Sequence, residues 1–373
     1  MPETRGIAMK KLLLASSALV GLAGAAAAEV SVTGDGRIGL RFDSDELVLN
    51  EAGVLVTRDT WNVISRARVR FTMTGETDSG LSFGAILRAD QADSRSSRGG
   101  SNSLYAGEVF ISGAFGRLTA GEVDSALESA VGDLPEVGLS GLNFYNEFQY
   151  SSSDFDELFQ DAGLLYSYAL GDATLYASFQ DQYFRLPGDA FARERGDTWS
   201  LGAGYTLGNY SFGIGYEDSS SFIDPVGYAF ANQSTAGNFY TNDATTWGVS
   251  GGTSFAGITF KAIYLATDVD GSADAGSWSL GDYDVNQLGV GAEYTMANGV
   301  GLKGFWRRID GDSLVVGGAT LDNEVDIWGL GAQYDLGGGA ILKGGIAHLD
   351  GDSIAFGQDI DKTVADFGVA LNF

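Results

Sequence analysis

Apolar and polar residues alternate with a period of two along about sixteen segments of this 373-residue chain. Such a period is typical of β-strands that present one apolar face and one polar face. The alternation therefore predicts an all-β protein. The predicted strands cover residues 30–42, 65–74, 81–88, 104–113, 117–123, 163–170, 174–182, 197–206, 210–218, 245–255, 258–267, 284–296, 300–309, 323–336, 340–349 and 363–373.

The connections between these segments alternate in length. Short turns, such as residues 171–173 and 207–209, follow every second segment, whereas residues 219–244 and 269–283 form long, acidic connections. Antiparallel strands can be joined by very short turns, while parallel strands need long crossovers. We therefore predict an antiparallel sheet with all short turns at one end and all long loops at the other.

Aromatic residues flank aliphatic ones on the apolar faces of several strands. In residues 199–205, Trp199 and Tyr205 lie six positions apart, or about 20 Å along a strand, with Leu201 between them on the same face. This spacing resembles the two aromatic girdles of a lipid-facing band. The opposite face is small and polar, which favours a water-filled bore over the bulky core of a soluble sandwich. The pattern predicts a transmembrane antiparallel β-barrel in an outer membrane.

The N-terminus has the features of an export signal. Lys10 and Lys11 precede an apolar run over residues 12–28 that ends in three alanines. A membrane-spanning helix is the alternative, but the run has only about 17 residues and no stop-transfer flank. We predict a cleaved signal peptide over residues 1–28, with Met9 as a possible true start, and a single barrel domain over residues 29–373.

Composition excludes several function classes. The net charge of −27 argues against a nucleic-acid partner, because such a protein needs a basic surface. The chain has no cysteine, which excludes disulfides and thiolate sites. His348 is the single histidine, and no Ser or Cys nucleophile motif accompanies it. We therefore expect that the protein is not an enzyme.

Four short runs carry a resemblance to a known family. These are residues 30–37, residues 72–81, the run Gly121-Glu-Val-Asp-Ser-Ala-Leu-Glu128 and the C-terminal Phe373. They resemble the general porins of Gram-negative outer membranes, most closely the alphaproteobacterial kind. The resemblance implies a barrel of about sixteen strands, with short periplasmic turns, long extracellular loops, a third loop folded into the pore, and assembly as a homotrimer.

Residues 124–161 interrupt the strand pattern and carry nine acidic residues without a Lys or Arg. If this stretch is the inward loop, its carboxylates could face a row of arginines on the first three strands, unless each charge is simply solvated. Lys303 and Arg307 could extend the basic wall. The acidic candidates are Asp124, Glu128, Asp133, Glu136, Asp154, Asp156 and Glu157. The basic candidates are Arg37, Arg41, Arg66, Arg68, Arg70 and Arg88.

Opposed charges would create a transverse field in the pore, through which small polar solutes pass and apolar ones are retarded. The resemblance implies passive diffusion of small hydrophilic solutes and ions, with outer-membrane lipid and lipopolysaccharide around the barrel. Two alternatives remain open. One is a substrate-selective channel for sugars or phosphate, and the other is a barrel enzyme such as a lipase or protease.

No cofactor is predicted, with one possible exception. Two Asp-Gly-Asp-Ser runs, which contain Asp310 and Asp312 and then Asp350 and Asp352, fall in predicted loops. Their carboxylates are hard oxygen ligands that could bind structural Ca²⁺, although neither run has the EF-hand pattern. Ordinary Asp-Gly turns are the alternative interpretation.

Overall fold

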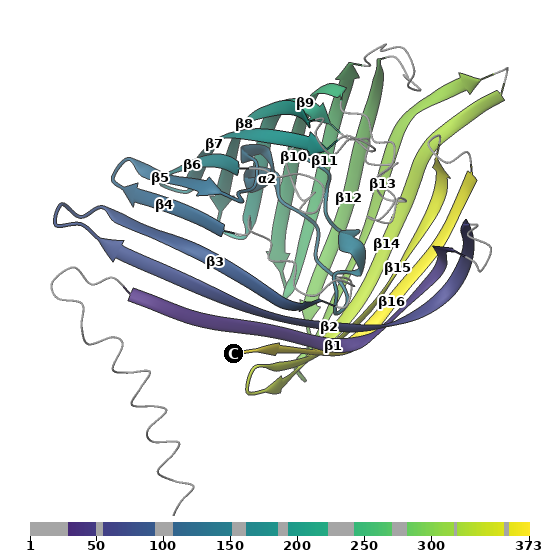
Figure 1. The fold of residues 1–373 in the computed structure, drawn as a ribbon, viewed down its shortest axis with the longest axis horizontal. Helices are drawn as coiled ribbons and strands as arrows, with labels where there is room; N and C mark the ends of the chain where they lie inside the picture. Colours follow the sequence, from purple (N-terminus) through teal and green to yellow (C-terminus); the bar gives the residue numbers. More distant parts are fainter. Residues whose placement is uncertain are drawn as a thin grey trace, which may run out of the picture.

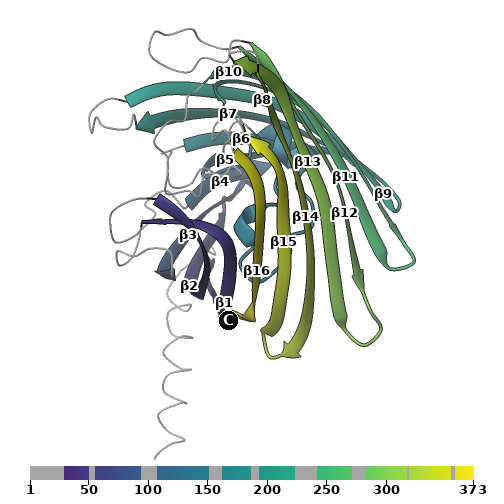
Figure 2. The same ribbon diagram turned by 90° about the vertical axis from the view of Figure 1, so that its right-hand side faces the viewer.

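A computed structural model describes residues 29–49, 55–93, 107–150, 162–185, 193–222, 242–270, 282–316, 319–353 and 358–373. The predicted signal peptide, residues 1–28, lies outside this range. The strands wrap around a central space, and a long connection enters that space (Figures 1 and 2). Each strand pairs antiparallel with its neighbours in sequence, and β1 pairs with β16, which closes the barrel. The prediction of an antiparallel β-barrel of about sixteen strands is confirmed.

The strands have the following bounds: β1 (Glu29–Leu49), β2 (Leu55–Glu76), β3 (Ser82–Asp93), β4 (Gly107–Gly113), β5 (Gly116–Gly121), β6 (Ala162–Leu170), β7 (Ala173–Arg185), β8 (Arg193–Leu207), β9 (Tyr210–Phe222), β10 (Asn242–Phe255), β11 (Ile258–Asp270), β12 (Tyr283–Thr295), β13 (Val300–Val316), β14 (Ala319–Gly337), β15 (Ala340–Ser353) and β16 (Gln358–Asn372). Two short helices, α2 (Ala126–Val131) and η2 (Leu142–Phe144), lie between β5 and β6. No helix in the described ranges is long and apolar enough to cross a membrane.

Several of the short turns are two-residue hairpins. Leu170 pairs with Ala173 across one turn, and Leu207 pairs with Tyr210 across another. Gly171 and Gly208 adopt φ values of 64° and 61°, in the left-handed region that glycine enters without steric cost. The positions of these glycines in the sequence therefore indicate the short-turn end of the barrel.

The seam of the barrel involves the last residue of the chain. The backbone N–H of Phe373 donates to the carbonyl of Gly34 at 2.8 Å, and the N–H of Gly34 donates back to Phe373 at 3.1 Å. Both edges of the sheet are thereby paired, which a spanning sheet in lipid requires, since an unpaired backbone group there costs several kcal/mol.

Several strands are longer than predicted. β1 and β2 pair as far as Leu49 with Leu55, and β13 and β14 pair as far as Val316 with Ala319. Much of the predicted loop sequence is therefore hairpin strand.

The Asp-Gly-Asp runs lie in strands β13 and β15, so their prediction as loop motifs is wrong. Asp310 pairs in register with Glu324, and Asp350 pairs with Asp326. Arg308 Nη1 lies 3.0 Å from Asp326 Oδ2 and also contacts Glu324, which compensates part of the acidic charge. Within the described residues, no three acidic or histidine side chains are grouped so as to hold a metal ion.

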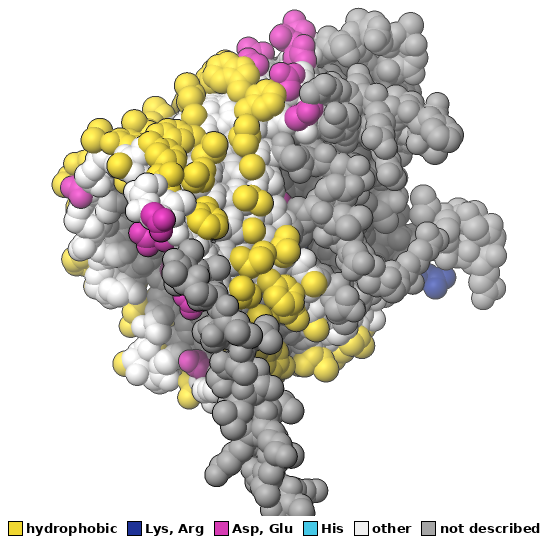
Figure 3. Space-filling view, turned by 60° about the vertical axis from the view of Figure 1, so that its left-hand side comes forward, with side chains coloured by type: hydrophobic (Ala, Val, Ile, Leu, Met, Phe, Trp, Pro, Cys, Tyr) yellow, Lys and Arg dark blue, Asp and Glu magenta, His cyan; other side chains and the backbone are white. Residues whose placement is uncertain are grey.

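The outward faces are apolar, as predicted. Hydrophobic side chains form a broad band over the described outer surface in Figure 3, interrupted by isolated charged side chains. The Trp199 and Tyr216 rings lie 5.4 Å apart, as do the Trp247 and Tyr264 rings, so aromatic side chains of neighbouring strands form a continuous row. Such a row suits the boundary between the lipid core and the headgroups, where an amphipathic ring meets both environments.

Candidate pore constriction

The connection after β5 enters the barrel and follows its inner wall. We call its described part, residues 122–150, the inner loop. Figure 1 shows α2 inside the barrel near β7 to β10, and η2 further along the loop. α2 contacts strands β7, β8, β9 and β10, and η2 contacts β15 and β16. The loop therefore crosses most of the inner wall and leaves β2 to β5 and part of β1 facing the remaining space.

A series of inward-facing glycines, which we call the glycine track, allows the loop to lie close to the wall. A Cβ added at Gly289 would lie 2.7 Å from Leu134 Cδ1, and one at Gly291 would lie 2.5 Å from Pro135 Cδ. A side chain at any track position would displace the loop. The track consists of Gly202, Gly213, Gly215, Gly248, Gly289, Gly291, Gly331, Gly345, Gly368 and Gly39. The prediction that these small residues line open water is wrong on this side of the barrel, because the loop covers them.

Hydroxyl groups on the wall hold the start of α2. The N–H of Ala126 donates to Ser178 Oγ at 2.9 Å and to Ser200 Oγ at 2.7 Å. Ser125 caps the helix, because its Oγ accepts from the N–H of Glu128 at 3.1 Å. These bonds satisfy N–H groups that the first turn of a helix leaves without partners. The inner loop is thus fixed to β7 and β8 at its root.

Apolar packing holds the middle of the loop. Inward-facing side chains of β11 to β15 join the apolar side chains of the loop in one buried cluster. Each fully buried Leu, Ile or Val contributes about 1.5–3 kcal/mol relative to an exposed one. The wall contributes Ile263, Leu265, Ile309, Ile327 and Leu349, and the loop contributes Leu127, Val131, Leu134, Val137, Leu142, Tyr145, Phe148 and Tyr150. This half of the barrel interior is therefore filled by packed side chains.

Arg307 holds residues 145–150, which we call the returning arm of the loop. Its Nη2 donates to Gln287 Oε1 at 2.6 Å, and its Nη1 donates to the backbone carbonyl of Glu147. The guanidinium also lies over the ring of Phe148, 5.0 Å from its centroid. Arg307 is only 5% exposed, so the expectation that it could extend a basic wall toward the lumen is wrong. Lys303 lies 3.7 Å from Glu293 on the neighbouring strand.

Tyr150 shows how completely this arm is buried. Burial raises the pKa of its hydroxyl well above the usual range, and the nearby carboxylates of Asp133 and Glu128 add to this effect. The hydroxyl therefore stays protonated and donates to the carbonyl of Gly132 at 2.9 Å. The bond connects the end of α2 to the returning arm.

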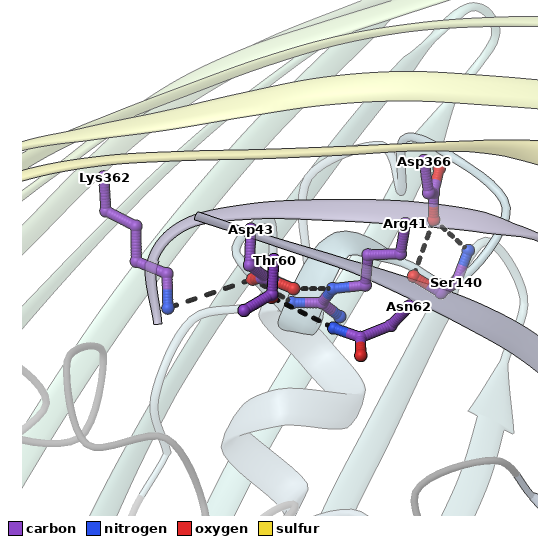
Figure 4. A network of polar contacts seen from close by, with 7 residues as sticks. All are labelled: Arg41, Asp43, Thr60, Asn62, Ser140, Lys362 and Asp366. Atoms are coloured by element: carbon purple, nitrogen blue, oxygen red, sulfur yellow. Dashed lines mark hydrogen bonds and ion pairs between the residues drawn. The ribbon is translucent and has the colours of Figure 1, made fainter. Parts of the chain in front are cut away.

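The tip of the loop, residues 139–144, is bound by Asp366 on β16 (Figure 4). Its Oδ1 accepts from the N–H of Leu139 at 2.7 Å, and its Oδ2 accepts from the N–H and the hydroxyl of Ser140 at 2.7 and 2.6 Å. Asp366 is 4% exposed. Three short bonds to one buried carboxylate are a strong, directional anchor, because charge-assisted bonds are about twice as strong as neutral ones.

Arg41 belongs to this buried network and not to the lumen surface, which corrects its prediction as part of the basic wall. It is 4% exposed, and its Nε lies 2.5 Å from Asp43 Oδ2. Lys362 Nζ lies 3.9 Å from the other oxygen of Asp43. With Arg41 next to Asp366 in the β1–β16 register, two cations and two carboxylates meet beside the loop tip (Figure 4).

The other predicted arginines lie on the inward faces of β1 to β3. Arg37 pairs in register with Arg66, and Arg70 pairs with Arg88. Arg66 Nη2 lies 2.7 Å from Asp35 Oδ1, so part of the positive charge is compensated within the wall. Arg70 is exposed, whereas Arg37, Arg66, Arg68 and Arg88 are half-buried.

Sequence reasoning missed Arg117 on β5. Its guanidinium lies 3.6 Å from the ring centroid of Phe110, and its Nη2 lies 3.7 Å from Glu108. Its position two residues before Thr119, on the polar parity of a predicted strand, was a signal that could have identified it.

The predicted acidic residues divide into four groups. Asp124 and Glu136 are exposed on the inner loop. Glu128 is only 8% exposed, so its prediction as a lumen-facing charge is wrong, because α2 buries this side chain against the wall. Asp133 acts within the loop, where its Oδ1 accepts from the N–H of Phe148 at 2.7 Å. Asp154, Asp156 and Glu157 lie outside the described residues.

Comparison with known proteins identifies the family. A family model described as Gram-negative porin matches residues 15–353. A porin from Rhodobacter capsulatus is 36% identical over 196 residues, which covers 52% of this chain and 57% of that protein. A porin from Fuscovulum blasticum is 27% identical over 298 residues, which covers 74% of this chain and 93% of that protein.

Solved structures agree with this fold. A porin structure refined at 1.8 Å resolution superposes with a TM-score of 0.65 and 28% identity, over 92% of this chain and 100% of that chain. OmpT, an outer membrane protein of Vibrio cholerae solved in a trimer form, superposes with a TM-score of 0.62 over 93% of this chain and 99% of that chain. Its identity of 13% supports the fold alone. The chain therefore belongs to the Gram-negative porin family and is an outer-membrane porin.

Proposed function

We propose that small hydrophilic solutes and ions diffuse passively through the space between the inner loop and strands β1 to β5. The observation that carries this proposal is the docking of the loop on one side of the barrel. The loop buries its apolar side chains against the wall, while Glu136 and Asp124 remain exposed on the loop and Arg70 remains exposed on β2. Charged groups on both sides of a water-filled passage favour polar solutes, and these solutes pass without losing their hydration shells. The family and the fold favour such a channel over a barrel enzyme.

The proposal predicts stepwise conductance. Purified protein added to a planar lipid bilayer in KCl should produce discrete current steps, and neutral polymers of increasing size should stop reducing the current once they are too large to enter. Passive diffusion also requires a current that rises in proportion to salt concentration. A protein that inserts but carries no current, or a current that saturates at low salt, would contradict passive diffusion.

The exposed charges should set the ion preference. A unit charge about 8 Å from a passing ion in water contributes about 0.5 kcal/mol, or roughly a two-fold change in permeability ratio. In a KCl gradient, Glu136→Gln should therefore shift the reversal potential toward anion preference, and Arg70→Gln should shift it toward cation preference. Asp172→Asn, in the two-residue turn between Leu170 and Ala173, is the control. Equal reversal potentials in all four proteins would show that these side chains do not face the ion path.

We also propose that the protein assembles as a homotrimer, surrounded by outer-membrane lipid and lipopolysaccharide. β5 has six residues, so it is about 20 Å long and, when tilted by about 45°, spans roughly half of a hydrocarbon core of about 30 Å. A neighbouring subunit would cover the apolar band where this strand is too short to span the hydrocarbon core. Trimers should insert together, so bilayer current steps should come in groups of three, whereas single steps throughout would contradict the assembly.

A further inference from the structure

One aromatic side chain of the inner loop faces water. The other large apolar side chains in residues 126–150 are buried, whereas Phe144 is 44% exposed. The loop is not loose at this point, because the N–H of Phe144 donates to Gly141 at 2.9 Å and its carbonyl accepts from Glu147 at 2.9 Å. Its exposure is therefore a feature of the fixed structure of the loop.

The backbone adopts a costly conformation to place this ring. Leu142 and Phe144 have φ values of 48° and 58°, a region that non-glycine residues seldom enter. Ala256 is the other described non-glycine residue with positive φ, and a two-residue hairpin turn accounts for it. At the loop tip, Leu142 is fully buried in this conformation, whereas Phe144 is exposed. Strain of this kind is typical of functional positions.

A carboxylate lies beside the exposed ring. Phe144 Cδ1 and Glu136 Oε1 lie 3.3 and 3.6 Å from the position that a Cβ on Gly141 would occupy. The ring and the carboxylate therefore flank one glycine on the same part of the loop, and Glu136 is exposed as well. A positive charge is attracted both to a carboxylate and to the face of an aromatic ring.

From this arrangement we infer that Phe144 and Glu136 form a contact site for organic cations that carry an aromatic or alkyl group. The inference rests on the proposed diffusion function and adds a solute preference to it. The arginines on β1 to β3 repel a cation toward the loop, where Glu136 attracts its charge and Phe144 contacts both its charge and its apolar part. An inorganic cation gains less, because its hydration shell separates it from the ring.

Block of the potassium current by benzyltrimethylammonium tests the site in planar bilayers. Phe144→Leu keeps an apolar side chain but removes the aromatic face, and Glu136→Gln removes the charge. Each variant should raise the half-blocking concentration about three-fold. Phe115→Leu is the matched control, since Phe115 is also 44% exposed but lies at a short turn outside the lumen, and its half-blocking concentration should equal that of the wild type.

Different failures are distinguishable. Equal block of the wild type, Phe144→Leu and Glu136→Gln, with normal KCl conductance, would overturn the site and leave the channel intact. The site would also be overturned if neutral benzyl alcohol reduced the current as strongly as benzyltrimethylammonium, because the contact would then be apolar only. Absence of KCl conductance in the wild type would overturn the channel and the site together.

Discussion

Replacing Asp366 with alanine is expected to release the tip of the inner loop from the wall. The carboxylate accepts three hydrogen bonds from Leu139 and Ser140, and each bond to a charged acceptor contributes about 1.5–3 kcal/mol. A net loss of about 3 kcal/mol would raise the undocked population more than a hundred-fold. Single-channel recordings should then show rapid current fluctuations between several levels in place of one steady open level.

Graded variants separate the anchor from general destabilisation. Ser140→Ala removes one of the three bonds and should cause a smaller increase in current noise. Asp366→Asn keeps an acceptor for one or two of them and should give an intermediate result. Thermal unfolding of the barrel, followed by circular dichroism in detergent, should change much less than the noise. Currents as steady in Asp366→Ala as in the wild type would show that the tip is held by packing alone.

Replacing Gly202 with valine should displace the root of the inner loop. A Cβ at this position would overlap the backbone carbonyl oxygen of Ala126 and lie 2.8 Å from Ala130 Cβ, so α2 must move toward the lumen. Overpacking of this kind typically costs about 1–3 kcal/mol. We expect lower single-channel conductance, a smaller size limit for neutral polymers and a lower unfolding temperature.

Gly204→Val is a closely matched control for this variant. Gly204 lies two residues further along β8 on the same face, but a Cβ there would have its nearest neighbour at 3.9 Å. Valine also favours a strand conformation, so this variant should fold and conduct like the wild type. If Gly202→Val and Gly204→Val had the same conductance and the same unfolding temperature, close contact between α2 and the wall would not limit the pore.

The barrel was predictable because its signals are local and repeated. The alternation in residues 199–205 gives the period, the lipid-facing side and the spacing of the aromatic rows at once. Turns such as Gly171-Asp172 need left-handed backbone conformations, so glycine indicates them directly. Pairing of neighbouring strands follows from the short turns, and only the seam between β1 and β16 joins distant segments.

The position of the inner loop against the barrel wall could not be predicted in the same way. An inward glycine such as Gly289 has the same appearance in the sequence whether water or Leu134 covers it. A signal was nevertheless present on β11, where Ile263 and Leu265 share the inward face with Lys261 and Thr267. Apolar residues on a face that should meet water indicate that something covers that face.

The arginine row shows a second limit. The alternation of inward and outward positions along β1 placed Arg41 on the inward face correctly. This alternation does not say which charges neutralise each other. Asp43 lies two residues further on the same face of the same strand, which is near enough for an ion pair. That spacing was visible in the sequence and would have removed Arg41 from the predicted lumen surface.

The position of the loop tip links the order of assembly to the formation of the pore. The tip contacts Gly39 on β1 and Gly368 on β16, the first and the last strands that the ribosome delivers. Its binding surface is complete only when these two edges meet. A barrel that is still open to one side in the membrane therefore cannot yet carry a finished filter. The chain acquires its permeability barrier to larger solutes in the same event that seals its wall.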